Sequence, residues 1–361
     1  MADFYELDFL DVESSKSGDA IAIRYQRGDT TRIHVVDGGF QTTGETLRDH
    51  INKYYDSPRQ IDAVIATHPD GDHAGGLRTI LEDFHVSELW MLRPWLYANE
   101  LIDSFARFSS VENLIKRLKD IYPNIAALED IALEKGIPIR EPIQGAKIGE
   151  FTVMAPTKDR YLEMVISSEK TPESAQKAED KELLGEIGSV FKDAINFIKA
   201  LWGDENFSDN ETSAENEMSV VQYATLNDHK ILLTADAGRS GLTEAADYAP
   251  QVGLSLPGID RFQVPHHGSR RNLSSELADR LLGERLDDKP AHGSGHFTAI
   301  VSAAKKDSHH PRKTVLRAMI HRGANILSTE EAHTRISRNA PDREGWSKAP
   351  LVEYPDEMEG D

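Results

Sequence analysis

The sequence contains no cysteine. Disulfide bonds, thiolate zinc sites and cysteine nucleophiles are therefore excluded. No apolar stretch approaches the roughly 18 residues that a membrane-spanning helix needs. The acidic opening, MADFYELDFLDVESS, lacks the basic flank and apolar core of a signal peptide. These absences predict a soluble, cytoplasmic protein without a membrane segment.

Positive charge is also scarce, because 41 lysines and arginines face 61 acidic residues and leave a net charge of -20. This balance argues against broad adhesion to nucleic acid. It still allows a local basic site, and residues 301–322 contain one acid, Asp307, among six basic residues: Lys305, Lys306, Arg312, Lys313, Arg317 and Arg322. Arg270 and Arg271 form a second basic pair. Solvated helix charges are the alternative interpretation.

Most of the chain alternates β-branched apolar runs with helical patterns, which predicts a layered α/β domain over residues 1–340. Charged helical sequence interrupts it at 158–215, and we expect an inserted helical hairpin there, with a helix start at 171–174 and an apolar stripe at 190–202. This insertion would serve as a lid or as a surface for a partner protein or a second copy. A charged flap closing on the core is the alternative. The acidic tail, 341–361, is predicted to be disordered.

The stretch Thr67–Gly76, THPDGDHAGG, concentrates two histidines and two aspartates within six residues. It follows the apolar run Ala63–Ala66, so the polar groups are expected in a tight loop after a buried strand, with His73 opening a helix. Imidazole nitrogens and carboxylate oxygens this close together favour divalent cations over solvent. A polar turn with incidental histidines is the alternative.

Other potential metal ligands also follow predicted strands. Asp37 follows one, Asp236 follows another, and His266 follows a third. In a layered α/β fold the strand ends converge on one edge of the sheet. An aspartate after a strand is usually only a turn former. Together, however, these four segments predict a pocket.

The ordered motifs resemble the metallo-β-lactamase superfamily, and within it the hydrolase domain of ComEC-type DNA-uptake proteins. The superfamily loop HxHxDH has the form HxDxDHxGG here, at His68–Gly76. The similarity extends over about residues 4–338 and omits 158–215. Its other elements, in order, are FLDV…GDAI with Gly18-Asp19, VVDGG, Asn216 to Ser219, LLTAD, PHHGS, and Ser302…His310-Pro311.

The resemblance implies a four-layer αββα sandwich with a helical insertion and two metal ions roughly 3.5–4 Å apart across a bridging water. Carried over residue by residue, His68 and Asp70 would hold the first metal. Asp72, His73 and His266 would hold the second, and Asp236 would bridge both. Asp37 matches a residue that supports the site from behind its ligands.

The chain departs from the wider superfamily at the first metal. No histidine occurs between His85 and His229, so that metal keeps only two protein ligands plus the bridge. Asp70 also replaces an imidazole with a harder oxygen donor. Both changes favour Mn²⁺ or Mg²⁺ over Zn²⁺ there, and they predict a loosely held first metal.

The metal pair would activate water, held by Asp72 among others, against a phosphodiester. His310 and His267 are the candidate proton donors to the leaving oxygen. For His267, a supporting or surface role is equally compatible with the sequence. Candidate phosphate-binding residues follow from their position beside the motifs: Ser269, Ser302, Arg270, Lys305 and Lys306.

Three hypotheses follow. The leading one is a metal-dependent phosphodiesterase acting on nucleic acid, with DNA as the expected substrate. The second is hydrolysis of a small phosphoester or cyclic nucleotide. The third is a partner-gated subunit that stays inactive until another protein engages the 158–215 insertion. ComEC-type domains are fused to a membrane channel, so a free-standing relative need not share their biology.

Overall fold

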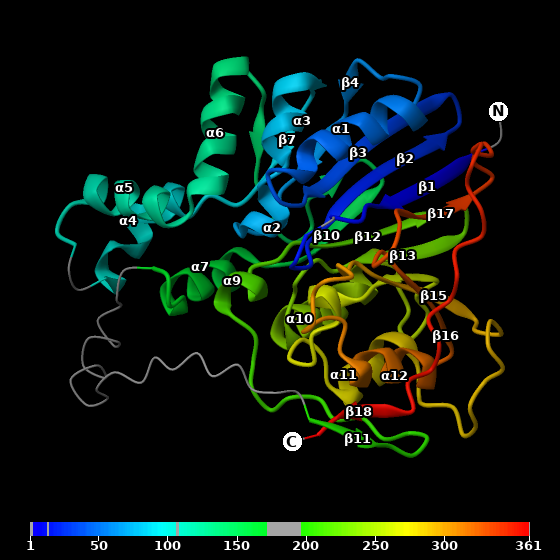
Figure 1. The fold of residues 1–361 in the computed structure, drawn as a ribbon. Helices are drawn as coiled ribbons and strands as arrows, with labels where there is room; N and C mark the ends of the chain where they lie inside the picture. Colours follow the sequence, from blue (N-terminus) through cyan, green and yellow to red (C-terminus); the bar gives the residue numbers. More distant parts are fainter. Residues whose placement is uncertain (1–2, 13, 106–107, 172–195, 361) are drawn as a thin grey trace, which may run out of the picture.

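Two seven-stranded sheets pack face to face in the computed structural model, which describes residues 3–12, 14–105, 108–171 and 196–360 (Figure 1). The first sheet has the order β17 (Thr334–Arg338), β1 (Phe4–Phe9), β2 (Ala20–Arg27), β3 (Thr30–Gly38), β5 (Ala63–Ile65), β7 (Leu89–Trp90) and β8 (Ile139–Arg140). The second has the order β16 (Ala324–Ser328), β15 (Phe297–Val301), β14 (Arg261–Gln263), β13 (His229–Leu233), β12 (Val221–Leu226), β10 (Phe151–Ala155) and β9 (Lys147–Ile148).

Helices cover the outer face of each sheet (Figure 1). Those on the side of the first sheet are α1 (Thr43–Tyr54), α2 (Gly71–Ala74), α3 (Leu77–Asp83), α4 (Ala98–Leu101), α5 (Val111–Ile121) and α6 (Pro123–Lys135). On the side of the second lie α10 (Arg239–Tyr248), α11 (Ser275–Leu282) and α12 (Lys313–His321), while α7 (Lys158–Ser167) and α9 (Ala214–Glu217) flank the sandwich. The structure therefore confirms the predicted αββα sandwich.

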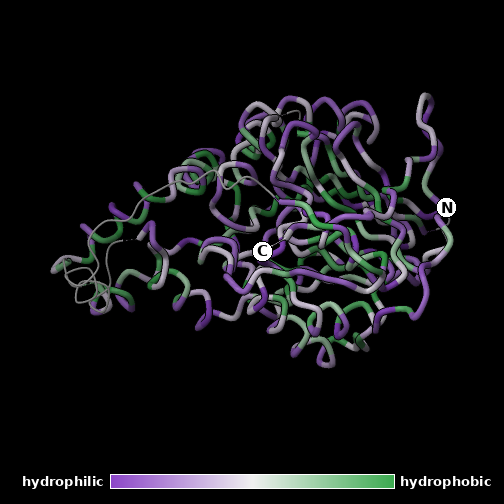
Figure 2. The backbone as a smooth tube through the Cα atoms, turned by 60° about the horizontal axis from the view of Figure 1, so that its bottom comes forward, coloured by the Kyte–Doolittle hydropathy of each residue, from purple (hydrophilic) through white to green (hydrophobic). Residues whose placement is uncertain are grey.

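The hydrophobic segments gather inside the body that holds the two sheets, and hydrophilic loops surround it (Figure 2). The central strands are buried on both faces, as β5 illustrates with three buried residues in succession, Ala63, Val64 and Ile65. Such strands are uninterrupted apolar runs because helices cover one face and the other sheet covers the second. This is why the sequence pattern located them.

Parallel pairing sets the position of the strand ends. Strand β3 pairs in parallel with β5, and β13 pairs in parallel with β14. All four strands therefore end on the same edge of the sandwich, where the chain turns toward the groove between the sheets. This edge receives Asp37, the His68–His73 loop, Asp236 and His266.

The predicted helix from His73 to about Phe84 is two helices, α2 and α3, separated by Gly75 and Gly76. The break follows from a close approach to β3. A Cβ atom on Gly76 would lie 2.0 Å from the carbonyl oxygen of Gly38, so only glycine fits at this position.

The prediction of a disordered acidic tail is wrong for residues 341–360. Arg343 pairs with Glu6 and Asp8 at the start of the chain. Farther on, β18 (Glu357–Glu359) pairs antiparallel with β11 (Phe197–Lys199). The tail is ordered because Arg343 and β18 have specific partners elsewhere in the chain, which composition alone does not reveal.

In the described parts of the 158–215 segment, α7 lies at its start and α9 begins at its end, while the predicted helical hairpin stays a prediction. Residues Phe197–Lys199 of the segment form a strand instead of part of an apolar helical stripe, and all three are exposed. Residues 172–174 of the predicted helix start and 190–195 of the stripe lie outside the described residues.

No described helix is both long enough and apolar enough to cross a membrane. The remaining short elements are the ladder of β4 (Gln60–Ile61) with β6 (His85–Val86) and four 3₁₀ turns: η1 (Pro94–Tyr97), η2 (Ile102–Ser104), η3 (Ala249–Val252) and η4 (Pro265–Gly268).

Candidate metal centre

Asp236, which follows β13, is the centre of the site. Its Oδ1 lies 3.3 Å from Nε2 of His73 and 3.7 Å from Nε2 of His267. Its Oδ2 lies 3.8 Å from Nε2 of His68 and 3.6 Å from Nε2 of His266. One carboxylate thus turns each of its oxygens toward a different pair of imidazoles.

This arrangement differs from the predicted ligand sets in the place of the two consecutive histidines. His267 is the histidine that joins Asp72 and His73, with 3.9 Å between its Nε2 and Asp72 Oδ2. His266 lies instead on the His68 side of Asp236. The first metal, for which the sequence offered only two protein ligands and the bridge, therefore gains the imidazole of His266 as a possible ligand.

Left-handed backbone makes this division possible. His266 and His267 have φ angles of 46° and 53°, and Ala235 and Asp37 have φ angles of 46° and 56°. Residues other than glycine rarely adopt this conformation, and its cost is typically about 1–3 kcal/mol each. Two successive left-handed residues bend the chain so that both neighbouring rings reach the same carboxylate. Clustering of such strain is typical of functional sites.

Hydrogen bonds on the far side of each ring aim Nε2 at Asp236. His73 Nδ1 lies 2.8 Å from Asp37 Oδ2, and His267 Nδ1 donates to the carbonyl of Ser302 at 2.9 Å. His266 Nδ1 lies 3.0 Å from Oδ1 of Asn272, whose amide in turn donates to the carbonyl of Asp236. Supporting bonds of this kind fix the tautomer and orientation of metal-binding histidines.

Asp37 lies where the resemblance implies, behind the pocket. It is fully buried, and it accepts hydrogen bonds from the backbone and hydroxyl of Thr67 at 2.8 and 2.6 Å. It therefore fixes both His73 and the start of the loop that contains His68.

The atoms that face one another in the centre lack hydrogen-bond partners among the described residues. They are the Nε2 atoms of His68, His73 and His267 together with Oδ1 of Asp236 and of Asp19. Buried polar atoms are normally paired, and each unpaired one costs about 1–3 kcal/mol. Imidazole nitrogens and carboxylate oxygens that converge within 4.8 Å fit divalent cations. The residues present therefore suit a metal.

The charges in the centre are strongly coupled. Burial alone would lower the pKa of His73, but Asp236 and Asp37 outweigh it and raise that pKa well above the ordinary value. Burial would raise the pKa of Asp236, yet His73, His266 and His267 hold it well below its usual range. Burial lowers the pKa of His68 and of His267, which keeps these rings neutral and able to bind a cation.

Asp19 belongs to this site although sequence reasoning gave it no role. Its Oδ2 accepts a hydrogen bond from Gln263 at 3.0 Å and lies 3.8 Å from His73 Nδ1. Burial raises the pKa of Asp19 to about 7. Gly18 brings it there, because a Cβ at Gly18 would lie 2.6 Å from the carbonyl oxygen of Asp72. The Gly18-Asp19 pair in the opening motif was the available signal.

Asp70, predicted to hold the first metal, already has a cationic partner. Its Oδ1 lies 2.7 Å from Nζ of Lys170, which follows α7. Burial would raise the pKa of Asp70, but His68 and Lys170 outweigh burial and lower that pKa. Among the described residues, neither Asp70 nor His266 is in any of the three groups whose ligand atoms lie within 4.8 Å of one another.

The basic stretch at 301–322 contributes less to the rim than its composition suggested. Arg317 and Arg322 are buried and bind backbone carbonyls and carboxylates inside the molecule. Lys305 pairs with Glu331, and Lys313 pairs with Glu357. These four residues do not form a free basic surface.

Of the basic residues that the sequence placed at the rim, Arg270, Arg271 and Arg312 have no ion pair in the described parts of the chain. Burial lowers the pKa of Arg312, and the nearby Arg270 and Arg271 act in the same direction. Lys306 is exposed. Of the two predicted phosphate-binding serines, Ser269 is 6% exposed and Ser302 is 2% exposed, so both lie beneath the surface. His310 is half-buried and stacks on His266, with 5.4 Å between ring centroids.

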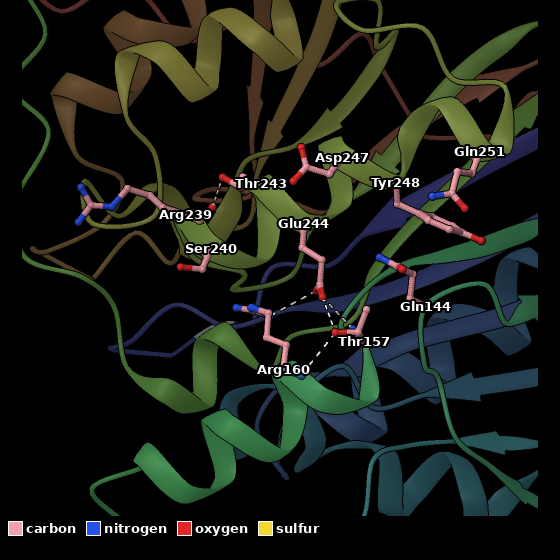
Figure 3. Close-up of a pocket in the computed structure, with 10 residues that line it drawn as sticks. All are labelled: Gln144, Thr157, Arg160, Arg239, Ser240, Thr243, Glu244, Asp247, Tyr248 and Gln251. Carbon is pink, nitrogen blue, oxygen red and sulfur yellow. Dashed lines mark hydrogen bonds and ion pairs between the residues drawn. The ribbon is translucent and has the colours of Figure 1, made fainter.

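A separate cavity lies away from the centre, between α7, α10 and the end of β10 (Figure 3). Its volume is about 530 Å³, and its polar lining includes Arg160, Arg239 and Glu244. Arg160 pairs there with Glu217 and Glu244. It contains none of the predicted site residues.

A model of the metallo-beta-lactamase superfamily matches residues 17–143, which include the THPDGDHAGG loop. This part of the chain therefore matches a metallo-beta-lactamase superfamily domain, and the described residues include His and Asp groups that could hold metal. No curated protein matches the sequence.

The solved structures that are similar to the chain include the following three. The metallo-beta-lactamase fold protein YhfI from Bacillus subtilis is 11% identical. The match covers 93% of this chain and 100% of that protein, with a TM-score of 0.40. A putative metallo-beta-lactamase from Thermotoga maritima is 9% identical over 69% and 92%, with a TM-score of 0.31. The metallo-beta-lactamase SMB-1, bound to 2-mercaptoethanesulfonate, is 9% identical over 70% and 77%, with a TM-score of 0.29.

Proposed function

We propose that this protein is a metal-dependent phosphodiesterase that acts on nucleic acid, with DNA as the substrate, and a relative of the ComEC-type hydrolase domain. The observation that carries the proposal is the position of Asp236 between two sets of imidazoles. A carboxylate with one oxygen toward each set is suited to bridge two cations. The ordered motifs from Gly18-Asp19 to His310-Pro311 support the ComEC-type assignment.

Two ligand groups follow from the distances. The first consists of Asp72, His73 and His267 with Oδ1 of Asp236. The second consists of His68 and His266 with Oδ2 of Asp236. Divalent cations held there would act as Lewis acids that promote ionisation of water and neutralise phosphate charge. Two imidazoles and at least one carboxylate oxygen in each group suit Mn²⁺ or Zn²⁺, with Mg²⁺ as an alternative.

The surrounding side chains suit a phosphodiester. The guanidinium groups of Arg270, Arg271 and Arg312 would bind phosphates beside the scissile one, since arginine matches phosphate in charge and geometry. His310, which lies against His266, would donate a proton to the leaving oxygen. His267 is reassigned from proton donor to ligand, because its Nδ1–H is bound to Ser302 and its Nε2 faces Asp236.

The test is cleavage of single- and double-stranded DNA by the purified protein with Mn²⁺, beside cyclic nucleotides and small phosphoesters. We expect DNA cleavage that a chelator abolishes and that falls at least 100-fold in Asp236→Asn. Asp62→Asn is the matched control, because Asp62 accepts a backbone hydrogen bond from Ile33 far from the centre. Undiminished cleavage by Asp236→Asn would contradict the mechanism.

The basic rim has its own test. Arg270→Gln combined with Arg312→Gln should weaken DNA binding and reduce the slope of log affinity against log salt by about 1–2. Cleavage of a small phosphoester should change little. If the pair weakens both substrates equally, or only small phosphoesters are cleaved, the nucleic-acid assignment fails. Hydrolysis that needs a second protein would favour a partner-gated subunit.

A further inference from the structure

The carboxylate of Asp307 is enclosed by hydrogen-bond donors. Its Oδ2 accepts from the backbone nitrogen of Ser17 at 3.0 Å and from the Ser17 hydroxyl at 2.8 Å. Its Oδ1 accepts from the backbone nitrogen of His309 at 2.9 Å. The side chain is only 8% exposed. Asp307 is therefore fixed in one orientation by Ser17, which precedes β2 of the first sheet, although Asp307 itself follows β15 of the second.

A fourth donor is the ring of His310, whose Nδ1 lies 3.2 Å from Oδ2 of Asp307. Burial would raise the pKa of Asp307, but these hydrogen bonds hold it well below its usual range, so the group is a carboxylate. A carboxylate only accepts, and Nδ1 of His310 must therefore carry the proton. Nε2 is then the nitrogen of His310 that remains to exchange a proton.

The ring of His310 borders the metal centre. It is tilted by 33° against the ring of His266 and meets the ring of His267 nearly edge-on, with 6.1 Å between centroids. Its side chain is 22% exposed, so solvent and substrate can reach it. If Asp307 only stabilised its own loop, its partner His310 would not need to lie against the metal centre.

We infer that Asp307, anchored by Ser17, is a positioning residue that holds His310 as the Nδ1–H tautomer for proton transfer through Nε2. The transfer step rests on the proposed phosphodiesterase activity, whereas the positioning does not. In that step, Nε2 of the neutral ring first takes a proton from solvent, and this proton moves to the leaving-group oxygen as the phosphorus–oxygen bond breaks. The ring then returns to its neutral form.

The first experiment reads the tautomer directly, by nitrogen NMR of the metal-free, histidine-labelled full chain at pH 8. His310→Gln identifies the His310 signals by their loss. We expect a protonated Nδ1 and an unprotonated Nε2 in the wild type, and loss of this preference in Asp307→Asn but not in Asp62→Asn. A wild-type ring protonated at Nε2, or an unchanged ring in Asp307→Asn, would overturn the inference.

The second experiment uses the leaving group. Thymidine 5′-p-nitrophenyl phosphate releases a good leaving group that needs no proton, whereas a thymidine dinucleotide releases a poor one. Asp307→Asn should lower kcat on the dinucleotide about 10²-fold, as loss of general acid catalysis does, with little change in KM. On the nitrophenyl ester the fall should stay below about threefold. Ser17→Ala, which keeps the Ser17 backbone donor, should have a smaller effect in the same direction.

A double variant separates positioning from a general structural defect. Asp307→Asn added to His310→Gln should cost nothing further if Asp307 acts only through His310. An equal fall on both substrates, or a full additional loss in the double variant, would overturn the inference. If the wild type cleaves neither substrate, the proposed function fails, and the NMR result alone then decides the positioning of His310.

Discussion

At the scale of single residues, His266 and His267 have different roles despite being neighbours. His267 is buried, donates to Ser302 and faces Asp236 Oδ1, whereas His266 is 22% exposed and faces Oδ2. The sequence predicted that this histidine pair reaches the centre. It could not predict which member joins Asp72, because that depends on two left-handed φ angles imposed by the surrounding fold.

Lys170 gives a prediction at this scale, because its ammonium already compensates Asp70. A divalent cation entering beside Asp70 must compete with that charge, which is worth about 1 kcal/mol or more at this separation. Lys170→Met should therefore raise the affinity for Mn²⁺ of the ligand group that contains His68 about 3–10-fold in a calorimetric titration.

Lys158→Met is the matched control for Lys170→Met, since Lys158, at the start of α7, forms an exposed pair with Glu100 of α4. This control should leave Mn²⁺ affinity unchanged. Equal Mn²⁺ affinities in the wild type and Lys170→Met would show that the ammonium of Lys170 does not compete with the metal for Asp70.

At the scale of elements, the sequence located most strands and the four strand ends that build the centre. These followed from local apolar runs, such as the one before His68. It missed the pairing of β11 with β18 and misassigned the 341–360 segment, because pairing between distant short strands leaves no periodic pattern. The composition of 301–322 likewise did not show that Arg317 and Arg322 are buried.

The connection from β11 to α9 depends on Glu205. Its carboxylate lies 2.8 Å from Nδ1 of His321, the last residue of α12. It also lies 2.7 Å from a guanidinium nitrogen of Arg322, which directly follows that helix. This connection leads on to Asn216, whose amide lies 3.2 Å from His266 Nδ1. Glu205 therefore anchors the segment that borders the centre.

Glu205 predicts a pH dependence of stability. Burial would raise its pKa, but hydrogen bonds from His321 and Arg322 outweigh burial and lower it from 4.5 to about 2. A carboxyl with a depressed folded-state pKa stabilises fully above its unfolded pKa and loses this contribution as pH falls. Glu205→Gln should thus lower the free energy of unfolding by about 3 kcal/mol at pH 7. The difference should shrink between about pH 4.5 and pH 2.

Thermal unfolding of metal-free protein across this pH range checks the prediction. Glu331→Gln is the control, because its pair with Lys305 is exposed and should contribute under about 1 kcal/mol. A stability difference for Glu205→Gln that stays constant down to pH 2 would contradict the role given to this carboxylate.

At the scale of the whole molecule, the centre joins the two sheets. Asp37, His68 and His73 come from the first sheet, whereas Asp236 and His267 come from the second. A cation that binds only the folded arrangement stabilises it by about 2.7 kcal/mol at 100 times its dissociation constant. We therefore expect Mn²⁺ to raise the Tm of the chelator-treated protein, and Asp236→Asn to remove most of this rise. An equal rise in Asp236→Asn would indicate binding elsewhere.

The most direct measurement is the anomalous scattering of Mn²⁺ in crystals of the protein soaked with that metal. Two anomalous peaks are predicted, one on each side of Asp236, the first beside Asp72, His73 and His267 and the second beside His68 and His266. An absence of peaks within coordinating distance of Asp236, with the metal bound elsewhere, would contradict the dinuclear centre on which the proposed function depends.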